Sequence, residues 1–194
     1  MTMGKEDMKK TKPIQVGIDF DGVLAYNPFR VIRAPITYVK KKVFNQKRTR
    51  FYIPQSDFEK MLWTVLHESS IFPARGVDLL KEKVAAGEIE AHLVTARYSF
   101  LQKNLFAWLD QHELRDTFKT ITINENDEQP HMYKARVVNE KGFDYFIEDN
   151  FDVVEHLRSK TNTDVLWIYN LLDRNVEHPH KFPYLEKALT AISP

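Results

Sequence analysis

A short apolar run that ends in two aspartates constrains this sequence more than any other feature. Residues 13–27 read PIQVGIDFDGVLAYN, and the apolar segment Ile14–Ile18 is followed at once by Asp19 and then by Asp21. The segment is short, contains β-branched residues and is bounded by a proline and the acids, which is typical of a buried strand. Carboxylates are costly to bury and add nothing to an apolar core. The two acids are therefore expected to stand in a site at the end of the strand.

The rest of the chain alternates short apolar segments with amphipathic segments of helical period. Further strands are predicted at residues 89–96, 118–123, 143–148 and 164–169. Helices are predicted at residues 57–69, 75–86, 100–112, 132–140, 152–159 and 184–192. This alternation predicts an α/β fold, a doubly wound parallel sheet with helices on both faces.

Polar residues gather where the predicted strands end. In open parallel sheets the ligand binds at the carboxyl ends of the strands, which all meet at one edge. We therefore expect the polar residues that follow the strands, or begin the helix after one of them, to converge at that edge. These residues are Asp19, Asp21, Thr95, Arg97, Lys134, Asp149 and Asn150.

An acidic cluster at strand ends is typical of a site for a hard cation. Mg²⁺ prefers oxygen ligands, usually one or two carboxylates, a carbonyl, waters and a substrate phosphate. Such an ion would let a carboxylate approach a phosphate dianion, since otherwise two negative charges would meet. Because the chain has no cysteine, thiolate zinc sites, disulfides and a cysteine nucleophile are excluded. The pattern favours Mg²⁺ and phosphoryl chemistry.

Four segments, in order along the chain, resemble the motifs of the haloacid dehalogenase-like (HAD) superfamily in its aspartate-phosphatase form. DFDGVLA, which begins at Asp19, is similar to the first motif, and LVTAR, which contains Thr95, is similar to the second. Lys134 matches the third motif, and FIEDN, which contains Asp149, resembles the fourth. The resemblance spans residues 16–169.

The resemblance implies a reaction and a role for each residue. Asp19 would attack phosphorus and form an aspartyl-phosphate. Asp21 would protonate the leaving oxygen and later deprotonate the hydrolytic water. Thr95 would hydrogen-bond a phosphoryl oxygen, and Lys134 would balance the charge on Asp19 and the phosphoryl group. Mg²⁺ would be held by the carboxylate of Asp19, the backbone carbonyl of Asp21 and the carboxylate of Asp149.

Two features depart from the family pattern. The fourth motif has Glu148 before Asp149 in place of a second aspartate, so Asp149 is predicted as the direct metal ligand, with Glu148 and Asn150 in supporting roles. The interval from Lys134 to Asp149 is short, at 149 − 134 = 15 residues, which leaves Lys141 open as an alternative to Lys134.

The interval after the first strand breaks the α/β alternation. We interpret it as a small cap inserted into the core, which predicts a polar tail at residues 1–12, a core at 13–24 and 73–194, and a cap at 25–72. The tail lacks the apolar centre of a signal peptide. No apolar run approaches the roughly 20 residues of a membrane span. The sequence therefore predicts a cytoplasmic protein without membrane contact.

The predicted cap carries an unusual charge. Residues 22–56 contain eight Lys or Arg and no acid, which leaves 28 − 8 = 20 basic against 27 acidic residues in the remainder. The segment is either a solvated surface or a surface over the site that concentrates an anionic substrate. Tyr38, Phe44, Phe51 and Tyr52 lie among the cations, which would suit stacking against a nucleobase. The candidate substrate-binding residues are Arg30, Arg33, Lys42, Arg48 and Arg97.

Structural explanations compete with functional ones for the other polar residues. Arg97 fits a helix start or a surface position better than a substrate contact. His178 and His180, in EHPH, could suggest a metal pair, but a solvated loop is the simpler prediction.

The leading functional prediction is a Mg²⁺-dependent phosphomonoesterase that acts on a small phosphorylated substrate, with nucleotides as the favoured class. The cap after the first motif and the short interval from lysine to acid also resemble the 5′(3′)-deoxyribonucleotidase-like branch of the superfamily. A phosphatase of sugar phosphates or of polynucleotide ends is the alternative within the enzyme class. A non-catalytic module that binds nucleic acid or another anion is the alternative outside it, although the acids would hinder polyanion binding without a metal.

Overall fold

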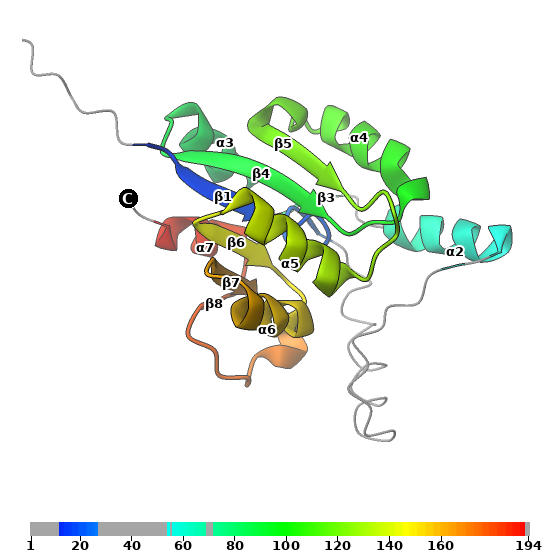
Figure 1. The fold of residues 1–194 in the computed structure, drawn as a ribbon. Coiled ribbons are helices and arrows are strands. Elements are labelled where there is room, and N and C mark those ends of the chain that lie inside the picture. Colours follow the sequence, from blue (N-terminus) through cyan, green and yellow to red (C-terminus); the bar gives the residue numbers. More distant parts are fainter. Residues whose placement is uncertain (1–11, 27–53, 55, 69–71, 193–194) are drawn as a thin grey trace, which may run out of the picture.

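A six-stranded sheet forms the centre of the molecule (Figure 1). The computed structural model describes residues 12–26, 54, 56–68 and 72–192. The strands lie in the order β5-β4-β1-β6-β7-β8, and each neighbouring pair is parallel. They are β1 (Ile14–Ile18), β4 (Ile89–Thr95), β5 (Phe118–Ile123), β6 (Tyr145–Glu148), β7 (Asp164–Ile168) and β8 (Lys181–Phe182). The predicted α/β fold with a parallel sheet is confirmed.

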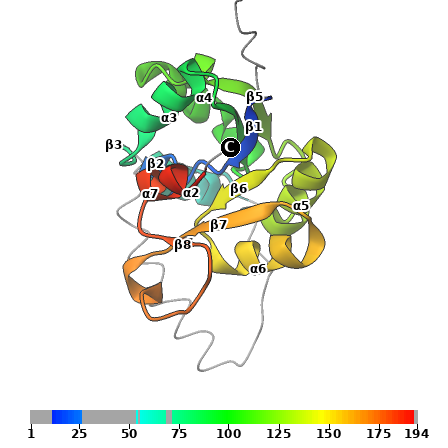
Figure 2. The same cartoon turned by 90° about the vertical axis from the view of Figure 1, so that its left-hand side faces the viewer.

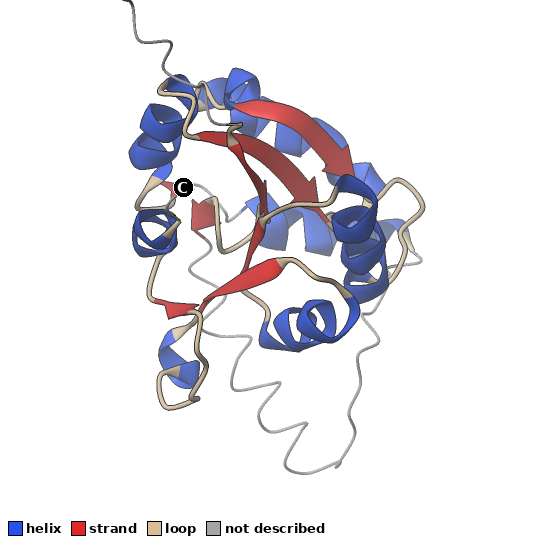
Figure 3. Cartoon of the chain, turned by 60° about the vertical axis from the view of Figure 1, so that its left-hand side comes forward, coloured by secondary structure: helices blue, strands red, loops and turns tan. Residues whose placement is uncertain are grey.

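Helices cover both faces of the sheet, as Figure 2 and Figure 3 show. One face carries α3 (Val77–Ala85), α4 (Gln102–Gln111) and α7 (Leu185–Ala191), and the other carries α5 (Pro130–Lys141) and α6 (Phe151–Lys160). Short 3₁₀ turns stand at Ser99–Leu101, Arg115–Thr117 and Leu171–Asp173. Within the described part of the chain, no helix has both the length and the hydrophobicity of a membrane span.

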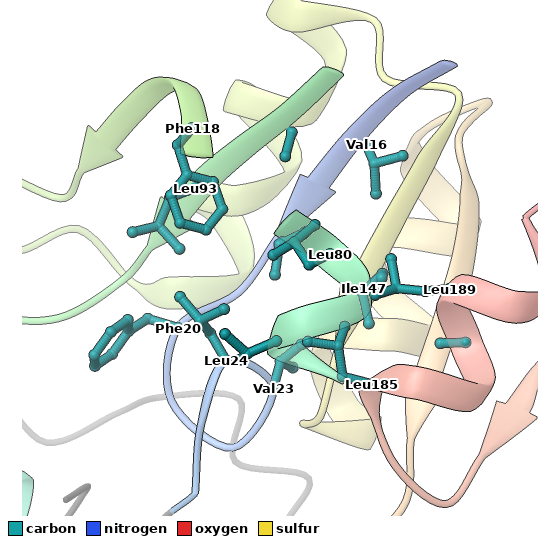
Figure 4. Close-up of a cluster of buried hydrophobic side chains, with 14 of the residues drawn as sticks. Val16, Phe20, Val23, Leu24, Leu80, Leu93, Phe118, Ile147, Leu185 and Leu189 are labelled. Atoms are coloured by element: carbon teal, nitrogen blue, oxygen red, sulfur yellow. The ribbon is translucent and has the colours of Figure 1, made fainter. Parts of the chain in front are cut away.

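Each face of the sheet has its own apolar core. Figure 4 shows the core under α3 and α7, where Leu80 and Leu185 meet the buried side chains of the sheet. The opposite core lies under α5 and α6 and includes Val138, Val154 and Trp167. Because both faces are covered, β6 (YFIE) and β7 (DVLWI) read in sequence as short apolar runs with an acid at one end.

The central strand β1 divides its residues between these two cores. Val16 and Ile18 are completely buried in the core under α3. Gly17 faces the other way, where a Cβ atom would lie 2.4 Å from the ring of Phe146 and 2.7 Å from that of Phe143. A side chain at this position would therefore displace these two rings.

The helices next to the candidate site begin and end at residues suited to those places. Pro130 starts α5, where its missing N–H costs nothing, and Gly142 ends it with a φ of 62°. Asn150 caps α6 by accepting a hydrogen bond from the backbone N–H of Asp152 at 3.0 Å. Pro130 and Asn150 thus fix where the two helices begin at the carboxyl edge of the sheet.

The two ends of the predicted insertion lie side by side. β2 (Ala25–Tyr26) and β3 (Phe72–Pro73) form an antiparallel pair, which is the small antiparallel insert that follows β1. Within the insertion, α2 (Asp57–Glu68) begins with a capping box in which Ser56 and Glu59 bond each other's backbone N–H groups. Residues 27–53, with most of the basic segment, lie outside the described residues.

The predicted loop at His178 and His180 is present, with exposed residues at 174, 175, 177 and 179, but the ring of His178 is not solvated. The side chain of His178 is only 2% exposed, and its ring packs edge-on against Trp167 with a centroid distance of 5.6 Å. The ammonium group of Lys181 donates to the backbone carbonyls of Asp173, Arg174 and Val176 at 2.6–3.1 Å. These bonds hold the first part of the loop next to the unpredicted strand β8, in which Lys181 lies.

Candidate active site

The register of the sheet brings the first and fourth motifs together. Ile18 pairs with Ile147 across β1 and β6, so the next residues, Asp19 and Glu148, stand at the same level at the carboxyl edge. The backbone N–H of Asp19 still donates to the carbonyl of Ile147 at 3.0 Å. Asp19 is 5% exposed and Glu148 is 1% exposed, so two carboxylates lie almost fully buried at the carboxyl edge.

Lys134 lies between these two carboxylates. Its Nζ is 2.8 Å from Oδ1 of Asp19 and 2.6 Å from Oε2 of Glu148, and its side chain is 5% exposed. The residue is carried by α5, whose start is fixed at Pro130. Lys141, the alternative left open by the sequence, is the exposed last residue of that helix. Of the two lysines, it is Lys134 that contacts the carboxylates at the carboxyl edge.

Hydrogen bonds hold the fourth motif in place. The Oε1 atom of Glu148 accepts the backbone N–H groups of Asp149 at 3.2 Å and Asn150 at 3.0 Å. The indole N–H of Trp167 donates to the backbone carbonyl of Asp149 at 3.1 Å. Glu148 thus uses one oxygen for the loop and the other for Lys134.

The electrostatics of this cluster are those of buried charges. Burial raises the pKa of Asp19 well above its ordinary value, and the neighbouring Glu148 raises it further, while Lys134 opposes both effects. Burial alone would lower the pKa of Lys134, but the carboxylates of Asp19 and Glu148 outweigh it and raise that pKa. The lysine is therefore held in its charged form.

The donor set fits a divalent cation. Carboxylate oxygens of Asp19, Glu148 and Asp149 all lie within 4.8 Å of one another. With all three acids ionised and Lys134 charged, the cluster carries −3 + 1 = −2, which one divalent cation would neutralise. Carboxylate oxygens are the ligands that Mg²⁺ prefers.

Arg97 makes a contact that the sequence did not predict. Its Nε and Nη2 atoms each donate to one carboxylate oxygen of Asp21 at 2.7 Å. The guanidinium carbon also lies 4.3 Å from the centre of the Phe20 ring. Arg97 is 6% exposed, so the expectation of a surface residue is wrong.

Thr95 contacts the backbone of Arg97 and so lies next to the pair of Arg97 and Asp21. Thr95 is 1% exposed, and its hydroxyl oxygen accepts the N–H of Arg97 at 3.2 Å. Another buried residue, Asn124, follows β5. Its side-chain amide donates to the backbone carbonyl of Glu128 at 2.7 Å and accepts the backbone N–H of Glu128 at 2.9 Å. Asn124 shapes the loop into α5, and its only signal in the sequence is an amide at a strand end.

The structure thus gathers the predicted residues into two groups at the carboxyl edge. Asp19, Lys134, Glu148 and Asp149 form the first, with Asn150 beneath it as a helix cap. Asp21, Arg97 and Thr95 form the second. The other candidate substrate-binding residues, Arg30, Arg33, Lys42 and Arg48, lie outside the described residues.

Solved structures match this fold over nearly the whole chain. A haloacid dehalogenase-like hydrolase from Xanthomonas campestris is 14% identical with a TM-score of 0.54, covering 93% of this chain and 94% of its own. YfnB from Bacillus subtilis, bound to magnesium, is 15% identical with a TM-score of 0.54, covering 91% and 96%. CbbY from Rhodobacter sphaeroides, in complex with phosphate, is 10% identical with a TM-score of 0.53, covering 89% and 95%.

The fold is that of the HAD-superfamily hydrolases. No protein-family model matches the sequence, and no curated protein matches it either. At 10–15% identity the likeness concerns the HAD fold alone, so chemistry has to be argued from the side chains at its carboxyl edge.

Proposed function

We propose that this protein is a Mg²⁺-dependent phosphomonoesterase that forms an aspartyl-phosphate on Asp19. The observation that carries the proposal is the buried contact of Lys134 with Asp19 and Glu148, beside Asp149. A fold does not need two desolvated carboxylates and a lysine, because apolar residues of similar volume are as stable or more so. Phosphoryl transfer does need fixed charges of this kind around phosphorus.

The residues at the edge suffice for both halves of the reaction. The Asp19 carboxylate attacks phosphorus, the ester P–O bond breaks, and Asp21 gives the leaving oxygen a proton to form the alcohol. Water then attacks the aspartyl-phosphate, Asp21 takes a proton from it, and the bond between Asp19 and phosphorus breaks to release phosphate. Lys134 orients the nucleophile by holding its Oδ1 atom. Thr95 donates its hydroxyl proton to a phosphoryl oxygen, since its oxygen already accepts from Arg97.

Mg²⁺ would be held by the carboxylates of Asp19 and Asp149 and by the backbone carbonyl of Asp21. When bound, the ion supplies the positive charge that lets a carboxylate approach a phosphate dianion. Glu148 is assigned to Lys134 and not to the ion, because both of its oxygens already accept hydrogen bonds from the protein. Its place is then to hold the lysine against the nucleophile.

Nucleotides are the substrate class that we propose for this site, with residues 25–72 as the cap over it. The acid-free basic segment 22–56, with its interleaved aromatic residues, supports an anionic substrate with a planar group. Aromatic rings next to Arg97 add to this. Tyr98 lies edge-on to Trp63 of α2 at 6.0 Å and stacks on Phe100 at 5.5 Å.

The test is phosphate release from a panel of nucleoside monophosphates, sugar phosphates and end-phosphorylated oligonucleotides, with Mg²⁺ and with a chelator. We expect turnover only with Mg²⁺, and the highest kcat/KM on nucleotides. A preference for sugar phosphates would refute the nucleotide assignment and leave the phosphomonoesterase intact. Absence of phosphate release from every member of the panel would refute the phosphomonoesterase itself.

A further inference from the structure

We infer that Arg97 is a positioning residue that acts on the reaction through Asp21 and makes no contact with the substrate. This inference rests on the proposed function, because it concerns the residue to which the acid–base role is assigned there. It differs from both sequence-based expectations for Arg97, which were a substrate contact and a helix-start or surface position.

The pairing geometry fixes the orientation of the Asp21 carboxylate. Two parallel N–H···O bonds of 2.7 Å join the guanidinium fork to both oxygens of the carboxylate. A planar fork bonded twice sets the plane of the carboxylate as well as its distance, which a single ammonium group does not do. The oxygen that exchanges a proton with the substrate is thereby held in one place.

Asp21 is accessible to solvent, whereas its partner Arg97 is not. The Arg97 side chain is 4% exposed, whereas the Asp21 side chain is 28% exposed. The arginine therefore lies behind the aspartate and against the ring of Phe20, 4.3 Å away. A ligand entering from solvent meets Asp21 and finds the guanidinium covered.

The backbone of Arg97 contributes to the same arrangement. Its N–H donates to the hydroxyl of Thr95, the last residue of β4, at 3.2 Å. The arginine is thus anchored to the strand at its backbone and to the ring of Phe20 at its side chain. Because Arg97 is held at its backbone and at its side chain, it can keep the carboxylate of Asp21 in a fixed orientation.

The decisive experiment is a double-mutant cycle with Arg97→Lys and Asp21→Asn, assayed on p-nitrophenyl phosphate with Mg²⁺. This substrate has a good leaving group, so the first step needs no proton from Asp21, and release of p-nitrophenolate by the Asp21→Asn variant is followed in single turnovers as well as at steady state. We expect Arg97→Lys to lower kcat by about 10- to 100-fold with little change in KM, because a misplacement of about 1 Å costs rates of this order. In the Asp21→Asn background the same change should alter kcat less than about 2-fold, since the group through which it acts is gone.

Arg115→Lys is the matched control. Arg115 forms the same kind of pair, with Nε 2.6 Å and Nη2 2.8 Å from the carboxylate oxygens of Asp110, and lies 4.5 Å over the ring of Phe106. It stands at the start of β5, at the opposite edge of the sheet. Its replacement should leave kcat and KM unchanged, and thermal unfolding of all variants shows whether each is folded at the assay temperature.

The outcomes separate this inference from the proposed function. If Arg97→Lys lowers kcat equally in both backgrounds, Arg97 acts independently of Asp21 and the inference is overturned while the phosphatase stands. A rise in KM with unchanged kcat would also overturn it, since Arg97 would then bind substrate. If the wild-type protein hydrolyses no phosphomonoester with Mg²⁺, the proposed function fails and takes the inference with it.

Discussion

Two arginine–aspartate pairs with the same geometry stand at opposite edges of the sheet. Arg97 and Asp21 are joined by two bonds of 2.7 Å, and Arg115 and Asp110 by contacts of 2.6 and 2.8 Å. Each guanidinium also lies over a phenylalanine ring, at 4.3 and 4.5 Å. The two pairs differ in their exposure to water, since the side chains are 4% and 28% exposed in the first and 46% and 56% in the second.

This difference in exposure means that the charges of the first pair lose most of their contact with water on folding, whereas those of the second pair keep much of it. In the exposed pair, Arg115 and Asp110 each give up some contact with water to contact one another, and this stabilises the folded state by about 1 kcal/mol or less. At the carboxyl edge the charges of Arg97, Asp19, Lys134 and Glu148 are desolvated, and apolar residues would serve stability equally well. Charges kept in such a place fit the proposed phosphoryl transfer, which needs fixed charges around phosphorus.

The largest expected effect is on turnover at the carboxyl edge. Asp19→Asn should lower kcat with Mg²⁺ on the order of 10⁴-fold, because the amide cannot form the aspartyl-phosphate. The fold should be retained, since burial already disfavours the charged form of Asp19 and raises its pKa. Phosphate release, with far-ultraviolet circular dichroism as a check of folding, measures both.

The matched variant for this prediction is Asp110→Asn at the opposite edge. It breaks the exposed pair with Arg115 and should leave kcat unchanged. Near-normal turnover by Asp19→Asn would contradict the assignment of the nucleophile, and a comparable loss in Asp110→Asn would erase the functional contrast between the edges.

The second prediction concerns stability. Lys134→Met should lower the free energy of unfolding by about 3–5 kcal/mol, because it leaves two buried carboxylates without their cation. Arg115→Met should lower it by about 1 kcal/mol or less. Urea denaturation of the metal-free proteins measures both values. Equal losses in the two variants would show that burial does not distinguish these charges.

The sequence predicted the elements well because apolar periodicity decides them. Every helix and strand predicted within the described residues lies within two residues of its observed bounds. Asp19, Thr95 and Lys134 could be placed at one edge because parallel strands share their carboxyl ends. Such an argument needs only the order of the elements and no contact between particular side chains.

The contacts within the site could not be predicted in this way. Arg97 and Asp21 are 76 residues apart, and a basic residue after a strand has the same pattern whether it is exposed or buried. Lys134 and Lys141 share one helix, and in α5 the neighbouring residues Tyr133, Lys134 and Ala135 are all buried, so no helical period shows which of the two lysines faces the carboxylates. Only the packing of α5 against the sheet decides between them.

The third prediction concerns the binding of Mg²⁺ to the clustered carboxylates at the carboxyl edge. Mg²⁺ should stabilise the wild-type protein by about 2.7 kcal/mol at a concentration 100 times its Kd, and it should raise Tm accordingly. Asp149→Asn should abolish most of this gain, since it removes one of the clustered carboxylates. Asp110→Asn should keep it in full. Differential scanning calorimetry across Mg²⁺ concentrations is the measurement, and equal shifts in all three proteins would contradict a site at this edge.

The smallest effect is expected from a buried polar group that takes no part in the site. His92 of β4 is 6% exposed, and its two ring nitrogens lie 2.8 Å from the hydroxyl of Thr120 and 3.0 Å from the side-chain oxygen of Gln15. Burial lowers the pKa of His92, and Glu90 opposes this only in part. The fold therefore accommodates this side chain in its neutral form, in contrast to the charges of the carboxyl edge.

A lowered pKa in the folded state gives the pH dependence a definite sign. The unfolded chain binds a proton near the ordinary histidine pKa of about 6.5, whereas folded His92 binds it only at lower pH. The contribution of His92 to stability is thus present above that value and lost as the pH falls below it.

Urea denaturation between pH 7.5 and 5.5 should give a shallower loss of stability for His92→Gln than for the wild type. The slope will not vanish, because burial also lowers the pKa of His156 and His178. An unchanged slope in His92→Gln would mean that His92 does not titrate with unfolding, and the contrast between its neutral burial and the charged edge would lose its support.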